Sequence, residues 1–201
     1  MIEQRSAEWF EIRRGKPSAS RFNQIVKADG TTSRSQDRYA QELALARLGY
    51  EKPRFSNAAM EVGVSREPLA VSAFEIITGM DTQEASFVLA DCGRYGASPD
   101  RHIGSDAVLE IKCPMDSTHT KTLERGEIPS KYIPQLRGQM LITDSSKGWF
   151  MSYHPDYDAF ITSIERDAEW DRLFMDEMSR FLDVVDVMEK GAIALSNFLK
   201  G

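Results

Sequence analysis

The sequence contains little cysteine and little histidine, two and three residues respectively among 201. Cys92 and Cys113 do not make a disulfide framework, so the scaffold of a small disulfide-rich secreted domain is excluded. They also cannot supply the cysteine cluster of an iron–sulfur centre. No pair among His102, His119 and His154 has the close spacing of metal ligands, which argues against a zinc site.

Long apolar runs are missing as well. No stretch approaches the roughly 18–20 apolar residues that cross a bilayer, and the first residues do not resemble a signal peptide, so we expect a cytoplasmic protein without membrane contact. The phosphate-binding pattern G-x-x-x-x-G-K-(S/T) does not occur in the sequence, so we expect no ATP. Hydrophobic residues make up 41% and charged residues 28%, and the length suits one domain, residues 1–201.

The most informative segment contains two short patterns, S-P-D ending at Asp100 and E-I-K beginning at Glu110. Residues two apart on a β-strand leave the same face, so Glu110 and Lys112 point together while Ile111 points into a core. A turn at 103–106 between antiparallel strands would return Asp100 to the same place. The spacing therefore predicts two carboxylates beside an ammonium group.

This combination suits phosphodiester hydrolysis. Asp100 and Glu110 supply hard oxygen ligands for Mg²⁺, and the carbonyl of Ile111 could be a further ligand. One or two such ions would orient and acidify a water molecule and neutralise developing charge. Lys112 would place or deprotonate that water and stabilise the pentacovalent phosphate. The alternative is an edge strand with a Glu–Lys surface pair, because E-x-K alone often occurs by chance.

With these patterns the chain resembles the PD-(D/E)xK nucleases, and among them the phage lambda exonuclease and YqaJ-type viral recombinase group of alkaline exonucleases. Three other segments match patterns of that group, in the same order along the chain: W-x-x-x-R-x-G with S-A-S at 9–20, G-x-x-x-E at 63–67 and Y-x-x-Q-x-x-x-Q at 132–139. The resemblance covers residues 5 to about 166. It implies an α/β (α+β) fold with a restriction-endonuclease-like core, a central mixed β-sheet flanked by helices.

The resemblance also implies roles for individual residues. Asp100, Glu110 and Lys112 would be catalytic, and Glu67 would join them from the start of its helix. The metal ligands would be Asp100, Glu110, Glu67 and the carbonyl of Ile111. An acid beside a helix start is also favoured by the helix dipole, which is a purely structural reason for Glu67.

Four other residues match the family's pocket for the 5′ phosphate of the digested strand: Arg13, Ser20, Ser98 and Gln135. A guanidinium, two hydroxyls and an amide are good phosphate donors. Each also has a structural alternative. Arg13 could lie at a helix C-terminus, Ser20 or Ser18 could cap a helix, and Gln135 could lie on a solvated face.

The chain departs from the family where Arg101 and His102 follow Asp100 in place of a glycine. Arg101 would contact the scissile strand or point outward. His102 is a candidate general base, although metal-activated water does not need one. The catalytic assignment is unaffected, but the local contacts with substrate are uncertain.

The resemblance implies a 5′→3′ exonuclease that depends on Mg²⁺, for which Mn²⁺ can substitute. It would digest one strand of linear double-stranded DNA from a 5′-phosphorylated end and leave a 3′ overhang. Implied partners are a single-strand annealing protein and two further copies in a homotrimeric ring, inside a bacterial host cell. Alternatives are a site-specific or structure-specific endonuclease on the same fold, and a catalytically silent DNA-binding accessory protein.

The net charge of −6 is unusual for a DNA-binding protein. Local distribution of charge decides a binding face, however, and the N-terminal third is basic in places while many acids lie between 167 and 189. We expect a basic side that faces DNA and an acidic outer side.

Apolar periodicity and Gly or Pro boundaries predict the elements. Helices are expected over 6–13, 18–28, 36–48, 65–78, 131–143 and 170–189, strands over 85–90, 95–98, 107–112, 148–154 and 159–165, and a separate short apolar segment over 192–198.

Overall fold

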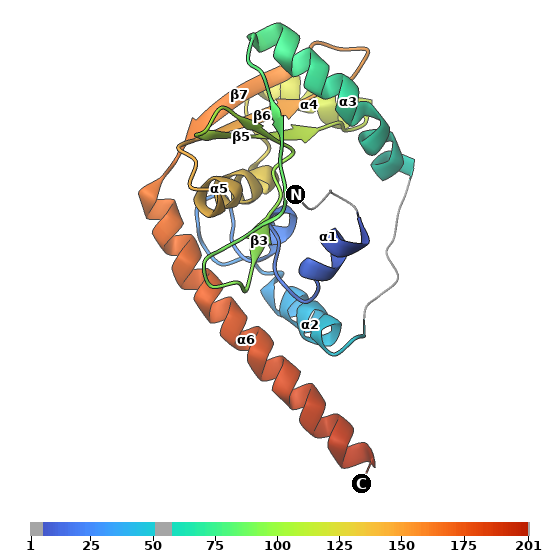
Figure 1. Ribbon diagram of the computed structural model, residues 1–201, viewed down its shortest axis with the longest axis vertical. Helices are drawn as coiled ribbons and strands as arrows, with labels where there is room; N and C mark the ends of the chain where they lie inside the picture. Colours follow the sequence, from blue (N-terminus) through green and yellow to red (C-terminus); the bar gives the residue numbers. More distant parts are fainter. Residues whose placement is uncertain (1–5, 51–57, 201) are drawn as a thin grey trace.

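The computed structural model describes residues 6–50 and 58–200 (Figure 1). Its helices are α1 (Ala7–Ile12), α2 (Gln36–Arg47), α3 (Ala58–Thr78), α4 (Asp116–Arg125), α5 (Ile133–Ile142) and α6 (Ala168–Lys200), with short 3-10 helices η1 (Ala19–Gln24) and η2 (Ser130–Tyr132).

The central sheet is mixed, as the sequence predicts. It contains β1 (Gln83–Glu84), β4 (Arg101–Ile103), β5 (Ala107–Lys112), β6 (Lys147–Ser152) and β7 (Phe160–Glu165), in the order β1-β4-β5-β6-β7. Strands β5 and β6 are parallel, and the other pairs are antiparallel. A separate small sheet pairs β2 (Val88–Leu89) with β3 (Gly96–Ala97).

Helices cover both faces of the central sheet. On one face, Phe74 of α3 packs with Leu109, Ile111 and Met151. On the opposite face, α5 packs its apolar side chains against β5 and β6. The side chain of Ile111 is buried, which confirms the prediction that it points into a core. The sheet is therefore the middle layer of a three-layer arrangement.

The β4–β5 hairpin forms where the sequence predicts a turn. Arg101 pairs with Leu109 and Ile103 with Ala107, so the turn lies between positions 103 and 107. Gly104 has a φ of 58°, a left-handed conformation that glycine adopts without strain. The hairpin brings residue 100 alongside β5, as expected.

Helix α5 approaches its neighbours closely because glycines stand at two contacts. A Cβ atom on Gly138 would lie 2.4 Å from the ring of Phe22 in η1, and one on Gly148 in β6 would lie 2.6 Å from Sδ of Met140. These spacings are shorter than real carbon contacts. The helix is thus held between η1 and the sheet, with little freedom to shift.

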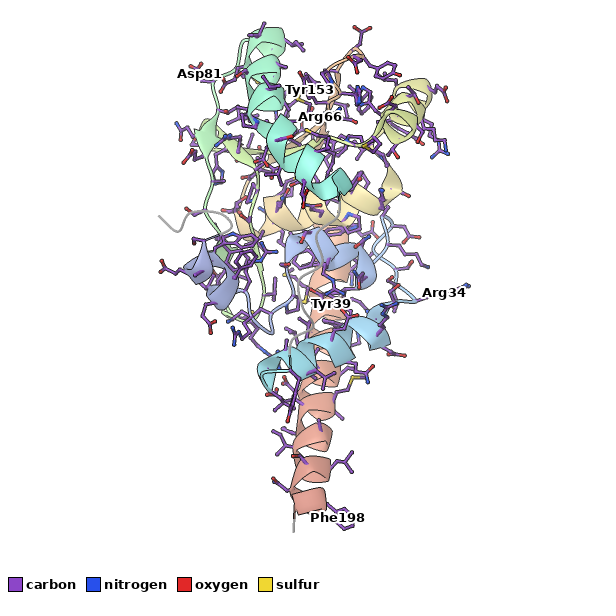
Figure 2. The ribbon with its side chains drawn as sticks, turned by 90° about the vertical axis from the view of Figure 1, so that its right-hand side faces the viewer. Arg34, Tyr39, Arg66, Asp81, Tyr153 and Phe198 are labelled. Carbon is purple, nitrogen blue, oxygen red and sulfur yellow. The ribbon has the colours of Figure 1, made fainter. Side chains whose placement is uncertain are left out.

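Helix α6 packs its first half against α2 and η1. Phe174, Phe181 and Val185 are fully buried with Tyr39 and Phe22 in a second core. Beyond this core α6 continues past the body of the molecule (Figure 1). Figure 2 shows Phe198 near its end, and this ring is 82% exposed.

Three expected helix boundaries are wrong. The separate segments 170–189 and 192–198 form one helix of 33 residues, because Gly191 is exposed and a single exposed glycine costs too little to interrupt it. The helix expected over 65–78 begins at residue 58, with Pro68 inside it. The helix expected over 18–28 is only η1.

The strands before residue 100 and helix α4 also differ from expectation. The strands expected over 85–90 and 95–98 shrink to two residues each in the small sheet. Helix α4 was not predicted, because its sequence is mostly polar and only His119 and Thr122 are buried. Within the part of the chain that the structure describes, no helix is long and apolar enough to cross a membrane.

The close packing around α5 can be tested by comparing Gly138, which is tightly packed, with Gly191, which has open space around it. We expect Gly138→Ala to lower the free energy of unfolding by about 1–3 kcal/mol, because the new methyl group must displace Phe22. Gly191→Ala should instead raise it by roughly 0.5–1 kcal/mol, because nothing lies within 4 Å and alanine favours a helix. Urea unfolding measures both changes, and equal effects would contradict this packing.

Candidate active site

One cavity of about 620 Å³ lies beside the end of β5. Its lining comes from α1, η1, α3, β5 and α5 and from the segment that precedes β4. Every predicted site residue lines it: Asp100, Glu110, Ile111, Lys112, Glu67, Arg13, Ser20, Ser98 and Gln135. The structure thus brings together side chains from positions 13 to 135 of the chain.

Asp100 is fixed against β5 by two backbone contacts. Its N–H donates to the carbonyl of Leu109 at 3.1 Å, and its Oδ2 accepts from the N–H of Ile111 at 2.7 Å. Because Ile111 stands between Glu110 and Lys112, the Asp100 carboxylate lies next to both. This is the two-carboxylate and ammonium arrangement that the spacing predicts.

Glu110 is buried, with 1% of its surface exposed, and both of its oxygens accept hydrogen bonds. Nε2 of Gln135 donates to Oε1 and Nε2 of Gln139 donates to Oε2, each at 2.6 Å. The Lys112 ammonium also contacts Oε1. Gln135 and Gln139 are four residues apart on α5, so one face of that helix presents both amides.

The charges in the cavity are coupled. Burial raises the pKa of Asp100 well above its usual range, and the neighbouring Glu110 carboxylate raises it further, against the Lys112 ammonium and the Ile111 N–H. Burial alone would lower the pKa of Lys112, but the Glu110 and Asp100 carboxylates outweigh it and raise that pKa. The ionised form of Asp100 is thus disfavoured until a proton or another cation neutralises it, which favours binding of a cation in the cavity.

The donor set suits an ion that keeps part of its water shell. In residues 6–50 and 58–200, no three His, Cys, Asp or Glu side chains lie close enough together to enclose a metal. Asp100 and Glu110 offer two carboxylates and Ile111 a carbonyl, and Mg²⁺ is typically bound by one or two carboxylates together with water and phosphate oxygens. The residues therefore fit Mg²⁺ as a partly hydrated ion.

Glu67 does not lie at a helix start, so that prediction is wrong: helix α3 begins at residue 58 and carries Glu67 in its interior. Its side chain lines the cavity, and its charge contributes to the raised pKa of Asp100. The helix dipole therefore does not explain this acid, because the dipole acts only within the first turn. Glu67 does not lie close enough to Asp100 and Glu110 for the three carboxylates to enclose one ion. A role of Glu67 at the metal would therefore run through the water shell of the ion.

A second group of polar side chains comes from α1 and η1. Nη2 of Arg13 donates to Oγ of Ser18 at 2.9 Å, and Oγ of Ser18 lies 3.4 Å from Oγ of Ser20. The Arg13 guanidinium stacks on the indole of Trp9, 3.7 Å from the ring centroid. Ser18 precedes η1 but its side chain caps no helix N–H. The capping alternative is therefore wrong for Ser18.

Two buried polar atoms that line the cavity lack a partner within the described residues. They are Oγ of Ser98 and Nε1 of Trp9. Buried polar atoms are almost always hydrogen-bonded in native proteins. Both are thus available to a ligand of the cavity. Gln135 is buried rather than on a solvated face, so its structural alternative is wrong too.

Four residues of the site stand within the quoted family patterns but were given no role there by sequence reasoning: Gln139, Trp9, Ser18 and Tyr132. The i, i+4 spacing of Gln135 and Gln139 was a usable signal, because it places both amides on one helix face. The ring of Tyr132 lies 5.2 Å from Nζ of Lys112, a contact between residues of two separate patterns.

Other candidates do not join the site. Arg101 pairs with Glu84 at 3.7 Å, and neither Arg101 nor His102 is among the residues that line the cavity. Cys113 does line it, but burial and the charges of Glu67 and Asp100 raise the pKa of its thiol to about 11. The thiol is therefore protonated near neutral pH and a weak nucleophile.

Residues 8–146 match the family described as the YqaJ-like viral recombinase domain. The chain belongs to this family. It is similar to LHK-Exo in complex with dAMP, with 32% identity and a TM-score of 0.87 over 96% of this chain and 100% of that one. A second structure, the alkaline exonuclease LHK-Exo from Laribacter hongkongensis, shows 31% identity and a TM-score of 0.80 over 94% and 100%.

A phage related exonuclease from Haemophilus somnus 129PT shares the fold, with 16% identity and a TM-score of 0.68 over 90% of this chain and 98% of that one. Among curated proteins no relative matches. The YqaJ-like family and the two LHK-Exo structures identify the chain as an exonuclease.

Replacement of Gln139 tests how its side-chain amide holds the Glu110 carboxylate. We expect Gln139→Met to lower kcat about 10–100-fold, because it removes the support of the Glu110 carboxylate, the predicted metal ligand, at nearly constant volume. KM for DNA ends should stay within about twofold, since Gln139 does not line the cavity. Gln24→Met is the control, because Gln24 contacts Arg21 instead. A rise in KM without a fall in kcat would contradict this role.

The raised pKa of Asp100 predicts a pH-dependent cost to folding. Its unfolded pKa is near 3.8, so wild-type stability falls as pH rises from there through the folded pKa. In EDTA at about pH 8, Asp100→Asn should therefore be more stable than wild type, and the difference should vanish near pH 3–4. Asp106→Asn should behave oppositely in the same buffer, because bonds from Ser146 lower the pKa of Asp106. Thermal unfolding across pH measures both signs.

Proposed function

We propose that the chain is a Mg²⁺-dependent 5′→3′ DNA exonuclease that digests one strand of linear duplex DNA from a 5′-phosphorylated end. One observation carries the proposal: the carboxylate–lysine group and the Arg13–Ser18–Ser20 group line the same cavity. A cleavage centre beside a site for a terminal phosphate is what an enzyme needs to cut next to a chain end. A 3′ single-stranded overhang would be the product.

The residues divide the chemistry between them. Asp100, Glu110 and the Ile111 carbonyl would hold the metal directly, and Glu67 would contact it through its water shell. When bound, the metal supplies an acidified water and neutralises charge on the phosphate. In the metal-free chain the Glu110 and Asp100 carboxylates raise the pKa of Lys112, which favours its ammonium form. An ammonium at this place is suited to stabilise charge on the phosphate oxygens.

The terminal phosphate would bind to Arg13, Ser20, Ser98 and Gln135. Arg13 is held rigidly by its stacking on Trp9 and its bond to Ser18, so it gives up little side-chain freedom when it binds an anion. Ser98 offers an unpartnered hydroxyl. Gln135 uses one amide N–H on Glu110 and carries a second that a phosphate oxygen can accept.

The partners follow from the reaction. A 3′ overhang is the substrate of single-strand annealing proteins, so we propose one as partner, in the cytoplasm of a bacterial host. A homotrimeric ring is proposed for the enzyme itself. An exposed apolar stripe on the outer part of α6 supports self-association, since Val187, Leu195 and Phe198 recur on one face and are 60–82% exposed.

The reaction is tested with linear duplex DNA that has one 5′ phosphate and a distinct label on each strand. Mg²⁺-dependent loss of the phosphorylated strand from its 5′ end is expected, with no loss in EDTA or with Lys112→Met. A closed circular duplex should stay intact. Cleavage of the circle would move the chain to the endonucleases, and no cleavage of either substrate would favour an accessory protein.

Arg13→Ala tests the phosphate pocket. We expect it to remove the preference for 5′-phosphorylated over 5′-hydroxyl ends, because removal of a bidentate donor weakens binding of the terminal phosphate. Digestion rates of matched phosphorylated and hydroxyl duplexes measure the ratio. Arg172→Ala is the control, because Arg172 lies on α6 and does not line this cavity. An unchanged ratio in Arg13→Ala would remove Arg13 from the pocket.

The ring is tested by mass in solution. Light scattering should give about three times the chain mass of 22.7 kDa. If the α6 stripe contributes, Leu195→Asp should shift the mass toward the monomer, whereas Ile77→Asp on α3, which replaces a side chain equally exposed at 60%, should not. A monomeric wild type would contradict the ring.

A further inference from the structure

A second cavity adjoins the first. It has a volume of about 770 Å³ and lies between α1, the segment that follows it, and α2. Arg13 and Ser18 line both cavities, so the hydrogen bond between these two side chains forms part of the wall that separates them. Any ligand of the second cavity is therefore next to the proposed site of the terminal phosphate.

The second cavity is basic in an acidic chain. The chain has 25 Lys and Arg residues against 31 Asp and Glu. Among the described residues, the cavity lining reverses this ratio, with one acid, Glu42, against five cations: Arg13, Arg14, Lys16, Arg21 and Arg38. Such a local excess of one sign in a concave surface concentrates its potential there and attracts anions.

The ion pairs of the lining do not cancel this excess. Glu42 is shared between Arg21 at 2.7 Å and Arg38 at 3.3 Å. Arg14 pairs with Glu11 of α1 at 2.9 Å. Two acids therefore face five cations, and the excess of positive charge persists. The Lys16 ammonium donates to the carbonyl of Ile12 at 3.0 Å, a neutral partner that does not compensate its charge. Arg38 is 81% exposed at its side chain and can reorient toward a ligand.

Aromatic side chains accompany the cations. Tyr50 lines the cavity and is 67% exposed, and Phe10 lines it from α1. Tyr39 points from α2 into the body of the molecule (Figure 2), and the Arg21 guanidinium lies 3.9 Å from its ring centroid. Cations that follow a backbone, with aromatic faces on which bases stack, are the features of sites for unpaired nucleic acid.

We infer that this second cavity binds a short segment of single-stranded DNA, beside the terminal-phosphate pocket. The inference rests on the proposed function for its choice of DNA as the anion. The size of the cavity favours single-stranded over double-stranded DNA. A hollow of this volume accepts a ligand of about one or two nucleotides, whereas a duplex cannot enter it. Lys16, Arg14 and Arg38 would contact phosphates, and Tyr50 would stack on a base.

The test measures binding without cleavage. Wild-type protein in EDTA is titrated into a labelled 5′-hydroxyl oligothymidine, and fluorescence anisotropy gives the affinity at several salt concentrations. The 5′-hydroxyl end avoids the terminal-phosphate pocket. We expect the double variant Lys16→Ala, Arg38→Ala to reduce the slope of log K against log salt by about 0.7 for each phosphate that is no longer neutralised, roughly 1.4 in total.

Controls separate this site from general electrostatics. Arg172→Ala, Arg180→Ala removes two exposed cations of α6 that line neither cavity and should leave the slope unchanged. Tyr50→Ala should weaken binding roughly five- to tenfold because the stacking surface is removed, and Tyr50→Phe should restore it. Tyr157→Ala, on an exposed tyrosine outside both cavities, should have no effect.

The outcomes are distinct from those of the function test. Wild-type protein that digests duplex DNA with Mg²⁺ but binds no oligothymidine in EDTA would overturn this inference and leave the exonuclease standing. Equal reductions in affinity for oligothymidine in the cavity variants and in the control variants would also overturn it. So would cavity variants that lose affinity for duplex DNA as much as they lose affinity for oligothymidine. If the protein binds oligothymidine, the cavity variants weaken this binding and duplex DNA is still not digested with Mg²⁺, the exonuclease proposal is refuted instead.

Discussion

The burial of Glu110 is the constraint on which the site depends. A carboxylate with 1% exposure cannot rely on water, so each of its oxygens needs a donor from the protein. Gln135, Gln139 and Lys112 supply them. These contacts fix the position of α5 relative to β5, and Gln139 extends the network by donating to the carbonyl of Ser98 at 3.3 Å. One buried charge thus links the strand, the helix and the segment that leads to Asp100.

The core supports this network by close packing rather than by additional polar contacts. Gly138 and Gly148 allow η1, α5 and β6 to approach more closely than any residue with a Cβ atom would permit. Because η1 is pressed against α5, Ser20 is held at a set distance from the amide of Gln135, although the two are far apart in the sequence. The spacing between the carboxylate group and the Arg13–Ser18–Ser20 group is therefore set by the hydrophobic core, and interiors packed at this density resist small displacements.

The sequence predicts the site best where the residues concerned are close together along the chain. The period of two places Glu110 with Lys112, and the glycine turn returns Asp100 to them, so this part of the site was predictable from one short segment. The burial of Glu110 was not, because it depends on α5, which comes much later in the chain. Helix α4 escaped prediction since its buried face consists of His119 and Thr122, which carry no apolar period. The continuity of α6 through Gly191 likewise reflects cumulative helix propensity that one residue cannot reveal.

The distribution of charge follows from where the acids of α6 are placed. Asp186 pairs with Arg47 at 2.8 Å and with Arg94 at 2.7 Å, and Glu189 pairs with Arg47 at 3.1 Å. These acids neutralise arginines on the side of α2 and of the small sheet that faces α6. The cations of the segment that follows α1 lie in the lining of the second cavity, where Glu42 is the one acid among the described residues. An acidic chain can therefore present a basic surface beside the carboxylates of Asp100 and Glu110, because part of its acid is carried by a helix on another side of the core. Net charge reports on solubility, whereas this placement decides which face meets a polyanion.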